Sequence, residues 1–232
     1  MPLSLQALLF DLDGTLIDSM PLHQQAWAEW HRLHALPFDT EGFFAATAGR
    51  ANAEILRELY PAADVAAIQA FADEKETLYR TAASRSLELI AGWEPLRAQA
   101  RALGLKLAIC TASTLPNMAL AFARFGLDKE VECVVSPADG VRGKPHPDIF
   151  ELAAQRLGVS AGACLVFEDA PLGIEAARRA GMRAVALTTT LPASAFTDFD
   201  NVVAIRPDLR DIDLGRIERK RPPVERQETR HA

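Results

Sequence analysis

Residues 8–19 read Leu-Leu-Phe-Asp-Leu-Asp-Gly-Thr-Leu-Ile-Asp-Ser, an apolar run that ends on two aspartates. The run predicts a buried strand, and Gly14 lets the backbone turn away at its end. Gathering Asp11 and Asp13 there is costly unless a positive group, most simply a divalent cation, offsets the cost. Asp11 is then placed to ligate a metal ion and attack an electrophile, and Asp13 to act as a general acid. The alternative is a strand-end turn in which both carboxylates only cap backbone amides.

A cluster of hydroxyl residues follows a second apolar run at residues 105–110. The hydroxyls and backbone N–H groups of Thr111, Ala112 and Ser113, at a strand end before a helix, suit an anionic oxygen. The alternative is an ordinary N-cap for the helix that we expect from Leu115 to about Phe125.

Two further segments carry charge after apolar runs. In residues 143–150, Gly-Lys-Pro-His-Pro-Asp-Ile-Phe, two prolines fix the backbone around Lys144, and Pro147 suits the first turn of a helix. The run at residues 164–167 ends in Glu168 and Asp169, a second acidic pair. A lysine held that stiffly is expected to be more than a solvated charge.

The charges of these segments do not balance, since four carboxylates face a single lysine. They indicate a bound divalent cation, and carboxylate ligands favour Mg²⁺ over Zn²⁺ or a softer metal. Histidine and cysteine at zinc spacings are absent from the sequence. The cation, Lys144 and the Thr111 hydroxyl would then surround three oxygens of a phosphoryl group and neutralise its charge during transfer to Asp11.

The four segments, in this order, resemble the motifs of the haloacid dehalogenase superfamily of aspartyl-phosphate phosphotransferases, from about Leu5 to about Asp213. The resemblance implies a nucleophile at Asp11 and an acid/base at Asp13. It implies Mg²⁺ held by the Asp11 side chain, the Asp13 carbonyl and Asp169, with Glu168 bound directly or through water. It also implies a phosphate site at Thr111, Ala112 and Lys144, to which we add Ser113 as a substrate-binding residue.

The residue two past the nucleophile tests the reaction type within that superfamily. A halide leaving group needs no acid, so Asp13 argues against the dehalogenases. The phosphonate-cleaving branch likewise lacks an acid there and is disfavoured. An alkoxide leaving group needs a proton, and a phosphoaspartate needs its water deprotonated, and one residue can do both in turn. The sequence therefore predicts a phosphoric monoester hydrolase, a phosphatase.

The distribution of apolar runs predicts two domains in the 232 residues. Runs at 105–110, 131–135, 164–167 and 183–187, with a weaker one at 201–205, alternate with helical segments, which predicts an α/β core with a Rossmann-like parallel sheet. We assign residues 1–16 and 89–215 to this core. Residues 17–88 have helical periodicity and form an inserted all-helical cap, which resembles the family's four-helix cap and would exclude water from the site. We expect residues 216–232 to be a disordered tail.

Three polar residues of the cap are candidates for substrate binding. His23 follows the hinge and resembles a histidine that related sugar-phosphate enzymes place over the site, although a solvated or core histidine is the alternative. Arg50 would offer a guanidinium to a second anionic group or to sugar hydroxyls, or is an exposed arginine at a helix start. Lys75 resembles a cap lysine that reaches the substrate, but Glu74 and Glu76 beside it suggest a solvated face.

Two other functions stay open. The chain also resembles β-phosphoglucomutase, which returns the phosphoryl group to another hydroxyl of a sugar bisphosphate. That branch holds the distal phosphate partly through an asparagine where this chain has Leu115, so we favour hydrolysis of a small sugar or polyol phosphate. A phospho-accepting signalling module is a third alternative, and the inserted cap and Asp13 argue against it.

Composition indicates an ordinary acidic protein, with a formal net charge of −6. Nucleic acid is therefore not an expected partner. Neither a membrane-spanning stretch nor a signal peptide is recognised, so we expect a cytoplasmic enzyme that is a monomer or a weak homo-oligomer. Its partner would be a small-molecule phosphate ester. The three cysteines, Cys110, Cys133 and Cys164, lie in or beside predicted strands and are expected to be reduced thiols.

Overall fold

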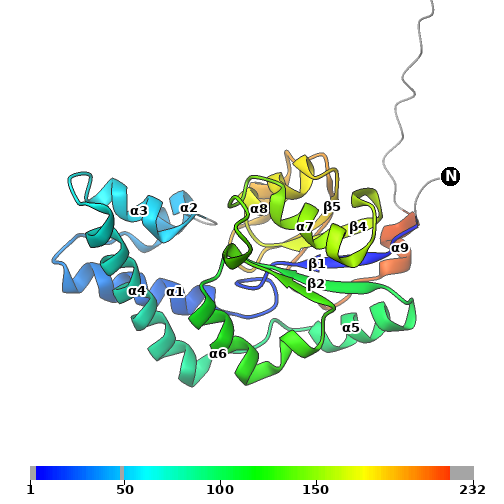
Figure 1. The fold of residues 1–232 in the computed structure, drawn as a ribbon, viewed down its shortest axis with the longest axis horizontal. Coiled ribbons are helices and arrows are strands. Elements are labelled where there is room, and N and C mark those ends of the chain that lie inside the picture. Colours follow the sequence, from blue (N-terminus) through cyan, green and yellow to red (C-terminus); the bar gives the residue numbers. More distant parts are fainter. Residues whose placement is uncertain (1–3, 48–49, 220–232) are drawn as a thin grey trace, which may run out of the picture.

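A parallel six-stranded sheet forms the centre of the computed structural model, which describes residues 4–47 and 50–219 (Figure 1). Its strands lie in the order β3-β2-β1-β4-β5-β6. Their bounds are β1 Ala7–Phe10, β2 Lys106–Cys110, β3 Cys133–Val135, β4 Cys164–Glu168, β5 Arg183–Leu187 and β6 Val202–Arg206. Each apolar run of the sequence corresponds to one strand, so the predicted Rossmann-like α/β core is confirmed.

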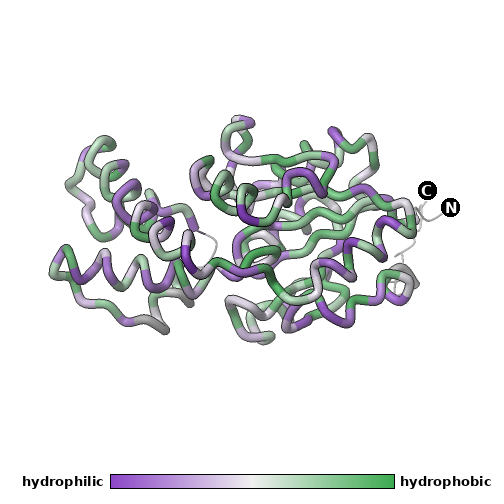
Figure 2. Tube along the Cα trace, turned by 90° about the horizontal axis from the view of Figure 1, so that it is seen from below, coloured by the Kyte–Doolittle hydropathy of each residue, from purple (hydrophilic) through white to green (hydrophobic). Residues whose placement is uncertain are grey.

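Helices cover both faces of this sheet because successive strand residues point to opposite sides. Leu8 and Phe10 of β1 pack in one core with helices α5, α6 and α9, whereas Ala7 and Leu9 pack in a second core with α7 and α8. The strands are largely hydrophobic in Figure 2, as expected for a sheet buried on both faces. The helix bounds are α5 Trp93–Ala102, α6 Leu115–Phe125, α7 Asp148–Leu157, α8 Pro171–Arg179 and α9 Leu214–Arg219.

The chain between β1 and α5 is helical and has its own core. It comprises α1 Met20–Leu33, α2 Thr40–Thr47, α3 Asn52–Leu59 and α4 Val65–Ser86, which Figure 1 shows grouped to one side of the sheet. The buried side chains of this insert include Trp27, Trp30, Ile55, Leu56 and Ile68. Because these residues recur at helical spacing, each helix turns one apolar stripe toward the others. We call this insert the cap.

The two segments that join the cap to the core lie side by side. Ile17 forms an antiparallel bridge with Leu89. The backbone N–H of Asp18 donates to the carbonyl of Glu88 at 2.9 Å, and that of Ile90 donates to Leu16 at 2.9 Å. The chain therefore leaves and re-enters the core at one place, at the edge of the sheet where β1 ends.

The end of the core differs from the sequence prediction. A disordered tail from residue 216 is wrong for residues 216–219, because α9 continues to Arg219. Leu214 and Ile217, one helical turn apart, are buried in the core that contains α5. Residues 220–232 lie outside the described part of the chain.

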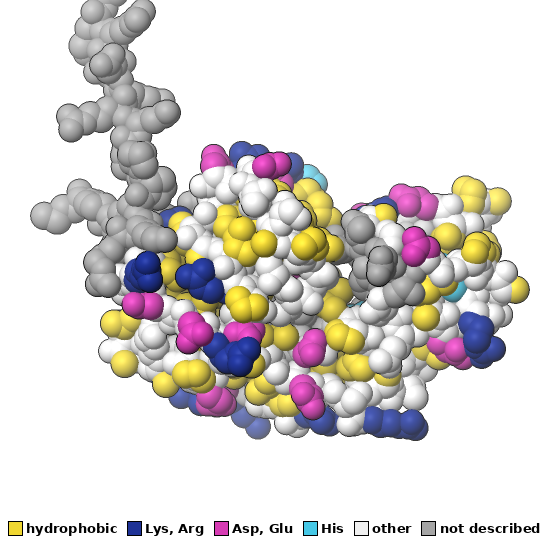
Figure 3. All heavy atoms as spheres, turned by 180° about the vertical axis from the view of Figure 1, so that it is seen from behind, with side chains coloured by type: hydrophobic (Ala, Val, Ile, Leu, Met, Phe, Trp, Pro, Cys, Tyr) yellow, Lys and Arg dark blue, Asp and Glu magenta, His cyan; other side chains and the backbone are white. Residues whose placement is uncertain are grey.

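Charges are mixed over the face seen in Figure 3, where acidic and basic side chains are interspersed. Within the described residues, no helix combines the length and the apolar character needed to cross a lipid bilayer.

Candidate active site

Asp11 lies directly after β1 and between two neighbouring strands. Phe10 pairs with Ile109 of β2 and with Phe167 of β4, so the residues after these three strands meet at one edge of the sheet. Asp11 is buried, and its Oδ1 accepts a hydrogen bond from Lys144 Nζ at 2.5 Å. Burial raises the pKa of Asp11 well above its ordinary value, and Lys144 only partly opposes this.

Asp13 points toward the cap rather than toward Lys144. Gly14 has a φ of 74°, a left-handed conformation that turns the chain immediately after it. Asp13 Oδ1 accepts a hydrogen bond from Ser19 Oγ at 2.7 Å and lies 3.6 Å from His23 Nε2. Burial raises the pKa of Asp13, but His23 and Ser19 outweigh this and hold that pKa below its ordinary value. Asp11 and Asp13 therefore occupy different environments although they are two residues apart.

Lys144 connects the two acidic pairs. Its Nζ donates to Asp11 Oδ1 and Glu168 Oε1, both at 2.5 Å, and to the Cys110 carbonyl at 3.1 Å. Burial lowers the pKa of Lys144, but the two carboxylates outweigh it and raise that pKa above the ordinary value. The lysine is thus a fixed, buried cation, as the two prolines that follow it in the sequence predict.

Glu168 and Asp169 are held by different groups. Glu168 Oε2 accepts the backbone N–H groups of Asp169 and Ala170, each at 3.1 Å, and its Oε1 binds Lys144. Asp169 accepts hydrogen bonds from Thr15 Oγ1 at 3.2 Å and from Thr190. Burial and the charge of Glu168 raise the pKa of Asp169 to about 7, although Thr190 opposes the shift.

Two glycines make room for this second pair. A Cβ on Gly14 would lie 2.2 Å from Asp169 Oδ2, and one on Gly173 would lie 1.8 Å from Glu168 Oε1. Both positions therefore exclude a side chain while the carboxylates stay where they are. The glycines fix the approach of the turn after β1 and of helix α8 to the acidic pair.

The hydroxyl cluster after β2 lies at the same edge of the sheet. Thr111 is buried, and its Oγ1 accepts the backbone N–H of Ser113 at 3.0 Å. The residue that precedes helix α6 is Thr114, so Thr111 and Ser113 are not its N-cap. Thr111, Ala112 and Ser113 all line the cavity described below.

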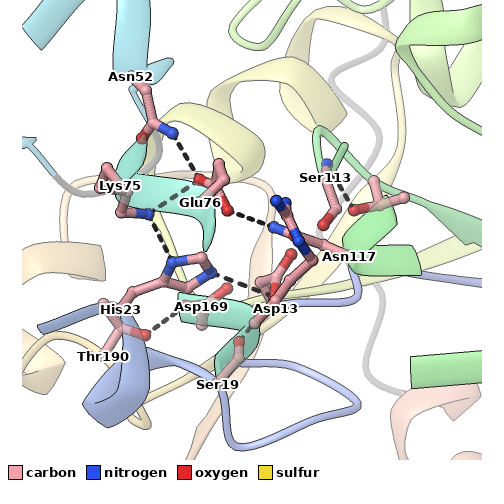
Figure 4. A network of polar contacts seen from close by, with 12 residues as sticks. Asp13, Ser19, His23, Asn52, Lys75, Glu76, Ser113, Asn117, Asp169 and Thr190 are labelled. Atoms are coloured by element: carbon pink, nitrogen blue, oxygen red, sulfur yellow. Dashed lines mark hydrogen bonds and ion pairs between the residues drawn. The ribbon is translucent and has the colours of Figure 1, made fainter. Parts of the chain in front are cut away.

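The two cap residues His23 and Lys75 contact each other above Asp13 (Figure 4). Lys75 Nζ lies 2.7 Å from His23 Nδ1, and His23 stacks on Tyr79 with ring centroids 3.8 Å apart. Burial lowers the pKa values of both His23 and Lys75. Lys75 is 2% exposed, so a solvated face at this position is wrong. It lies one turn from Ala72 and Tyr79, which places it on the buried side of α4.

Arg50 lies at the rim of the cap. Its guanidinium contacts Glu58 in two places, at 2.5 and 3.2 Å, and lies 3.9 Å from Glu54. These ion pairs are partly exposed to solvent. The arginine faces the cavity but is engaged by carboxylates of its own helix region.

A cavity of about 390 Å³ between core and cap unites these side chains. Its lining includes every site residue that the sequence predicts: Asp11, Asp13, His23, Arg50, Lys75, Thr111, Ala112, Ser113, Lys144, Glu168 and Asp169.

Sequence reasoning missed several polar residues of the site. Thr190 follows β5 in a run of three threonines, the same signal that identified Thr111 after β2. Glu76 lies on the buried stripe of α4, four residues after Ala72, a signal hidden by the charged run around it. Asn52 and Asn117 carry no local signal, because their contacts come from distant segments. Ser19 lies only six residues after Asp13, in the stretch that decides the fold, and was not recognised as its hydrogen-bond partner.

The donor set at the core end of the cavity suits a hard cation. Among the described residues no group of three or more His, Cys, Asp or Glu side chains forms a complete metal cluster. The ligands that the family resemblance implies are two carboxylates and one backbone carbonyl, so such a site contains fewer than three of these side chains. Burial and mutual repulsion raise the pKa values of Asp11 and Asp169, which shows that Lys144 alone does not neutralise the acids. The residues therefore fit a divalent cation with oxygen ligands.

Comparisons with known proteins agree with this geometry. Residues 5–181 match the family model described as haloacid dehalogenase-like hydrolase. The chain is 36% identical over 186 residues to fructose-1-phosphate phosphatase YqaB of Escherichia coli, an alignment covering 77% of this chain and 94% of the relative. It is 32% identical over 206 residues to hexitol phosphatase A of Escherichia coli, which covers 89% of this chain and 88% of the relative.

A solved structure supports the same assignment. The crystal structure of a HAD hydrolase, family IA, variant 3, from Entamoeba histolytica superposes with a TM-score of 0.84 and is 26% identical in sequence. The match covers 93% of this chain and 100% of that chain. The sequence and structural matches span both the core and the cap. This chain therefore belongs to the haloacid dehalogenase-like hydrolase family.

Proposed function

We propose that the protein is a Mg²⁺-dependent phosphatase that hydrolyses a small sugar or polyol phosphate through an aspartyl-phosphate on Asp11. The observation that carries this proposal is the constellation of Asp11, Lys144 and Asp13 in one cavity between core and cap. Its relatives include enzymes named fructose-1-phosphate phosphatase and hexitol phosphatase, which supports an ester of that class.

Asp11 is the proposed nucleophile. Lys144 binds its Oδ1, while no hydrogen bond to its Oδ2 is found among the described residues. A carboxylate oxygen of Asp11 attacks phosphorus, the bond from phosphorus to the ester oxygen breaks, and the leaving alkoxide takes a proton from Asp13. Asp13 must carry a proton for this step, and the negative charge of a bound ester raises its pKa against the lowering by His23 and Ser19 in the free enzyme. Asp13 then accepts a proton from the attacking water, and phosphate leaves Asp11 as a free carboxylate. Asp13 thus regains in the second step the proton that it gives up in the first.

Residues after β2 and Lys144 form the proposed phosphate site. Lys144 supplies positive charge beside the transferring group, and the Thr111 hydroxyl and the backbone N–H of Ala112 would donate hydrogen bonds to its oxygens, whereas the N–H of Ser113 is used by Thr111 Oγ1. Glu168 positions Lys144, because it binds the ammonium with one oxygen and the backbone with the other. His23 positions Asp13 from the cap side.

Asp11, the Asp13 carbonyl and Asp169 would hold Mg²⁺, with Glu168 bound directly or through water. When bound, the cation supplies positive charge that offsets the clustered carboxylates and polarises the phosphoryl group. Lys144 and two backbone N–H groups already bind Glu168, which favours the water-mediated contact.

The test is a screen of purified protein with Mg²⁺ against phosphorylated sugars, polyols, glycolate and nucleotides, with released phosphate as the readout. We expect turnover on sugar or polyol monophosphates and a trapped phosphoenzyme in Asp13→Asn, detected by mass spectrometry. Glucose 1-phosphate with a bisphosphate primer belongs in the same screen, since isomer formation there would identify a mutase. Absence of phosphate release from every ester would contradict the proposal. A stable phosphoenzyme in the wild type, without turnover, would instead favour the signalling module.

A further inference from the structure

The end of the cavity that faces the cap is built from a buried carboxylate and two amides. Glu76 on α4 is 6% exposed, and its Oε1 accepts hydrogen bonds from Asn52 Nδ2 at 2.5 Å and from Lys75 Nζ at 2.9 Å. Its Oε2 accepts Asn117 Nδ2 at 2.5 Å. Asn52 begins α3 of the cap and Asn117 lies on α6 of the core, so the cluster joins both domains (Figure 4).

The cations at this end are already paired. Lys75 binds Glu76 and His23, and Arg50 binds Glu58 and approaches Glu54. Arg80 donates to Asn117 Oδ1 at 3.2 Å and binds this amide from outside the cavity lining. Within the described lining, therefore, no lysine or arginine at the cap end is left without a carboxylate partner.

The charges that line the cavity also argue against a second phosphate group at the cap end. The described lining contains seven carboxylate side chains and three lysines or arginines, and Asp73 and Glu54 add to Glu76 at the cap end. Burial raises the pKa of Glu76, but Lys75 and His23 outweigh it and keep the carboxyl ionised. A phosphate dianion placed beside this desolvated carboxylate would be repelled strongly, because the local dielectric is low.

Neutral hydroxyl groups fit the same cluster. Glu76 Oε2 accepts one hydrogen bond, and a carboxylate oxygen has room for a second. Each amide of Asn52 and Asn117 uses one N–H toward Glu76 and retains another donor. A vicinal pair of hydroxyls would donate to the carboxylate and accept from an amide, which a phosphate without protons cannot do.

We propose that Glu76, Asn52 and Asn117 form a subsite for the hydroxyl groups at the uncharged end of the substrate, which admits monophosphates of polyhydroxylated compounds and rejects bisphosphates. This inference rests on the proposed function and narrows its substrate class. It also opposes the mutase alternative, because a mutase must bind a bisphosphate.

The experiment compares kcat/KM for fructose 1-phosphate, fructose 1,6-bisphosphate and 4-nitrophenyl phosphate. The variants are Glu76→Gln and, as a control, Glu74→Gln, which makes the same change at an exposed position of the same helix outside the cavity lining. We expect the wild type to prefer the monophosphate by about 100-fold or more. Glu76→Gln should lose about tenfold on fructose 1-phosphate, since a hydrogen bond to a charged carboxylate is replaced by a weaker one to a neutral amide, and should gain on the bisphosphate.

The remaining arms separate the outcomes. 4-Nitrophenyl phosphate has no hydroxyls, so Glu76→Gln should lower its turnover less than that of fructose 1-phosphate, and only through the contacts of Glu76 with Lys75 and of Lys75 with His23. Asn52→Ala, at a half-buried position, keeps the charge and should still weaken fructose 1-phosphate alone, which covers the case that Glu76→Gln does not fold. Failure on all three esters contradicts the proposed function. The subsite alone is overturned if 4-nitrophenyl phosphate is turned over but both fructose esters are used equally, or fructose 1-phosphate is not used at all. An equal response in Glu74→Gln overturns it as well.

Discussion

The two ends of the cavity carry charge in opposite ways. At the core end, Asp11, Glu168 and Asp169 gather around a single lysine, and burial with mutual repulsion raises the pKa values of Asp11 and Asp169. At the cap end, each described cation has a carboxylate beside it. The core end therefore demands additional positive charge, whereas the cap end demands none. This difference supports the proposal that metal and phosphate bind at the core end and uncharged hydroxyls at the cap end.

The ends also differ in how their residues are held. The core residues follow adjacent strands, where the pairing of Phe10 with Phe167 sets Asp11 beside Glu168. The cap residues come from helices that meet only when the cap lies against the core, as Glu76 and Asn117 do. The proposed chemistry thus depends on residues that strand pairing places, and the proposed selection depends on contacts between cap and core.

Replacement of the nucleophile is the strongest test of the core end. Asp11→Asn keeps the shape of the side chain but cannot form an acyl phosphate, so kcat should fall by at least about 10⁴-fold. The measurement is phosphate release, with thermal unfolding to verify the fold. The matched control is Asp18→Asn, an exposed aspartate just beyond the turn, which should retain full activity. Turnover in Asp11→Asn within tenfold of the wild type would falsify the nucleophile assignment.

Removal of the cation tests the charge imbalance directly. Treatment with a chelator should lower kcat by at least about 100-fold, and added Mg²⁺ should restore it, because a bound cation contributes several kcal/mol to charge stabilisation. Mg²⁺ should also raise the Tm, since it binds the folded protein. An equal ionic strength of NaCl is the control. An enzyme that keeps most of its activity in chelator would show that Lys144 suffices at the core end.

Most of the core end could be predicted from the sequence, and most of the cap end could not. Asp11, Thr111 and Glu168 each follow an apolar strand, and parallel strands bring such residues to one edge. Glu76 could not be recognised from the sequence because a charged run on a helix usually faces solvent. Only its position one helical turn before the buried Tyr79 shows that it lies on the buried side of α4. The partners Asn52 and Asn117 depend on how the cap rests on the core, which local pattern does not encode. The helix α9 was missed because Leu214 and Ile217 form a stripe too short to recognise among polar residues.

A smaller effect is expected when the support of Lys144 is disturbed. Gly173→Ala places a Cβ at a position 1.8 Å from Glu168 Oε1, so the carboxylate must move away from the lysine. We expect kcat to fall by about tenfold, since one hydrogen bond to a charged group is lost. The double variant Gly173→Ala with Glu168→Asp shortens the displaced side chain. Its activity should exceed the product of the two single effects. Simple additivity would mean that the glycine acts elsewhere.

The smallest effect should come from Arg50, because its ion pairs with Glu54 and Glu58 already neutralise it. Arg50→Ala should lower kcat/KM for fructose 1-phosphate by about two- to fivefold and leave 4-nitrophenyl phosphate unchanged, in keeping with partly exposed ion pairs that contribute about 0–1 kcal/mol. Glu58→Gln makes the opposite change, since it releases the guanidinium from its closest partner. If the cap end rejects bisphosphates for want of a free cation, Glu58→Gln should improve use of fructose 1,6-bisphosphate slightly. An equal loss on both esters in Arg50→Ala would place the arginine in the machinery of phosphoryl transfer and remove the distinction between the two ends.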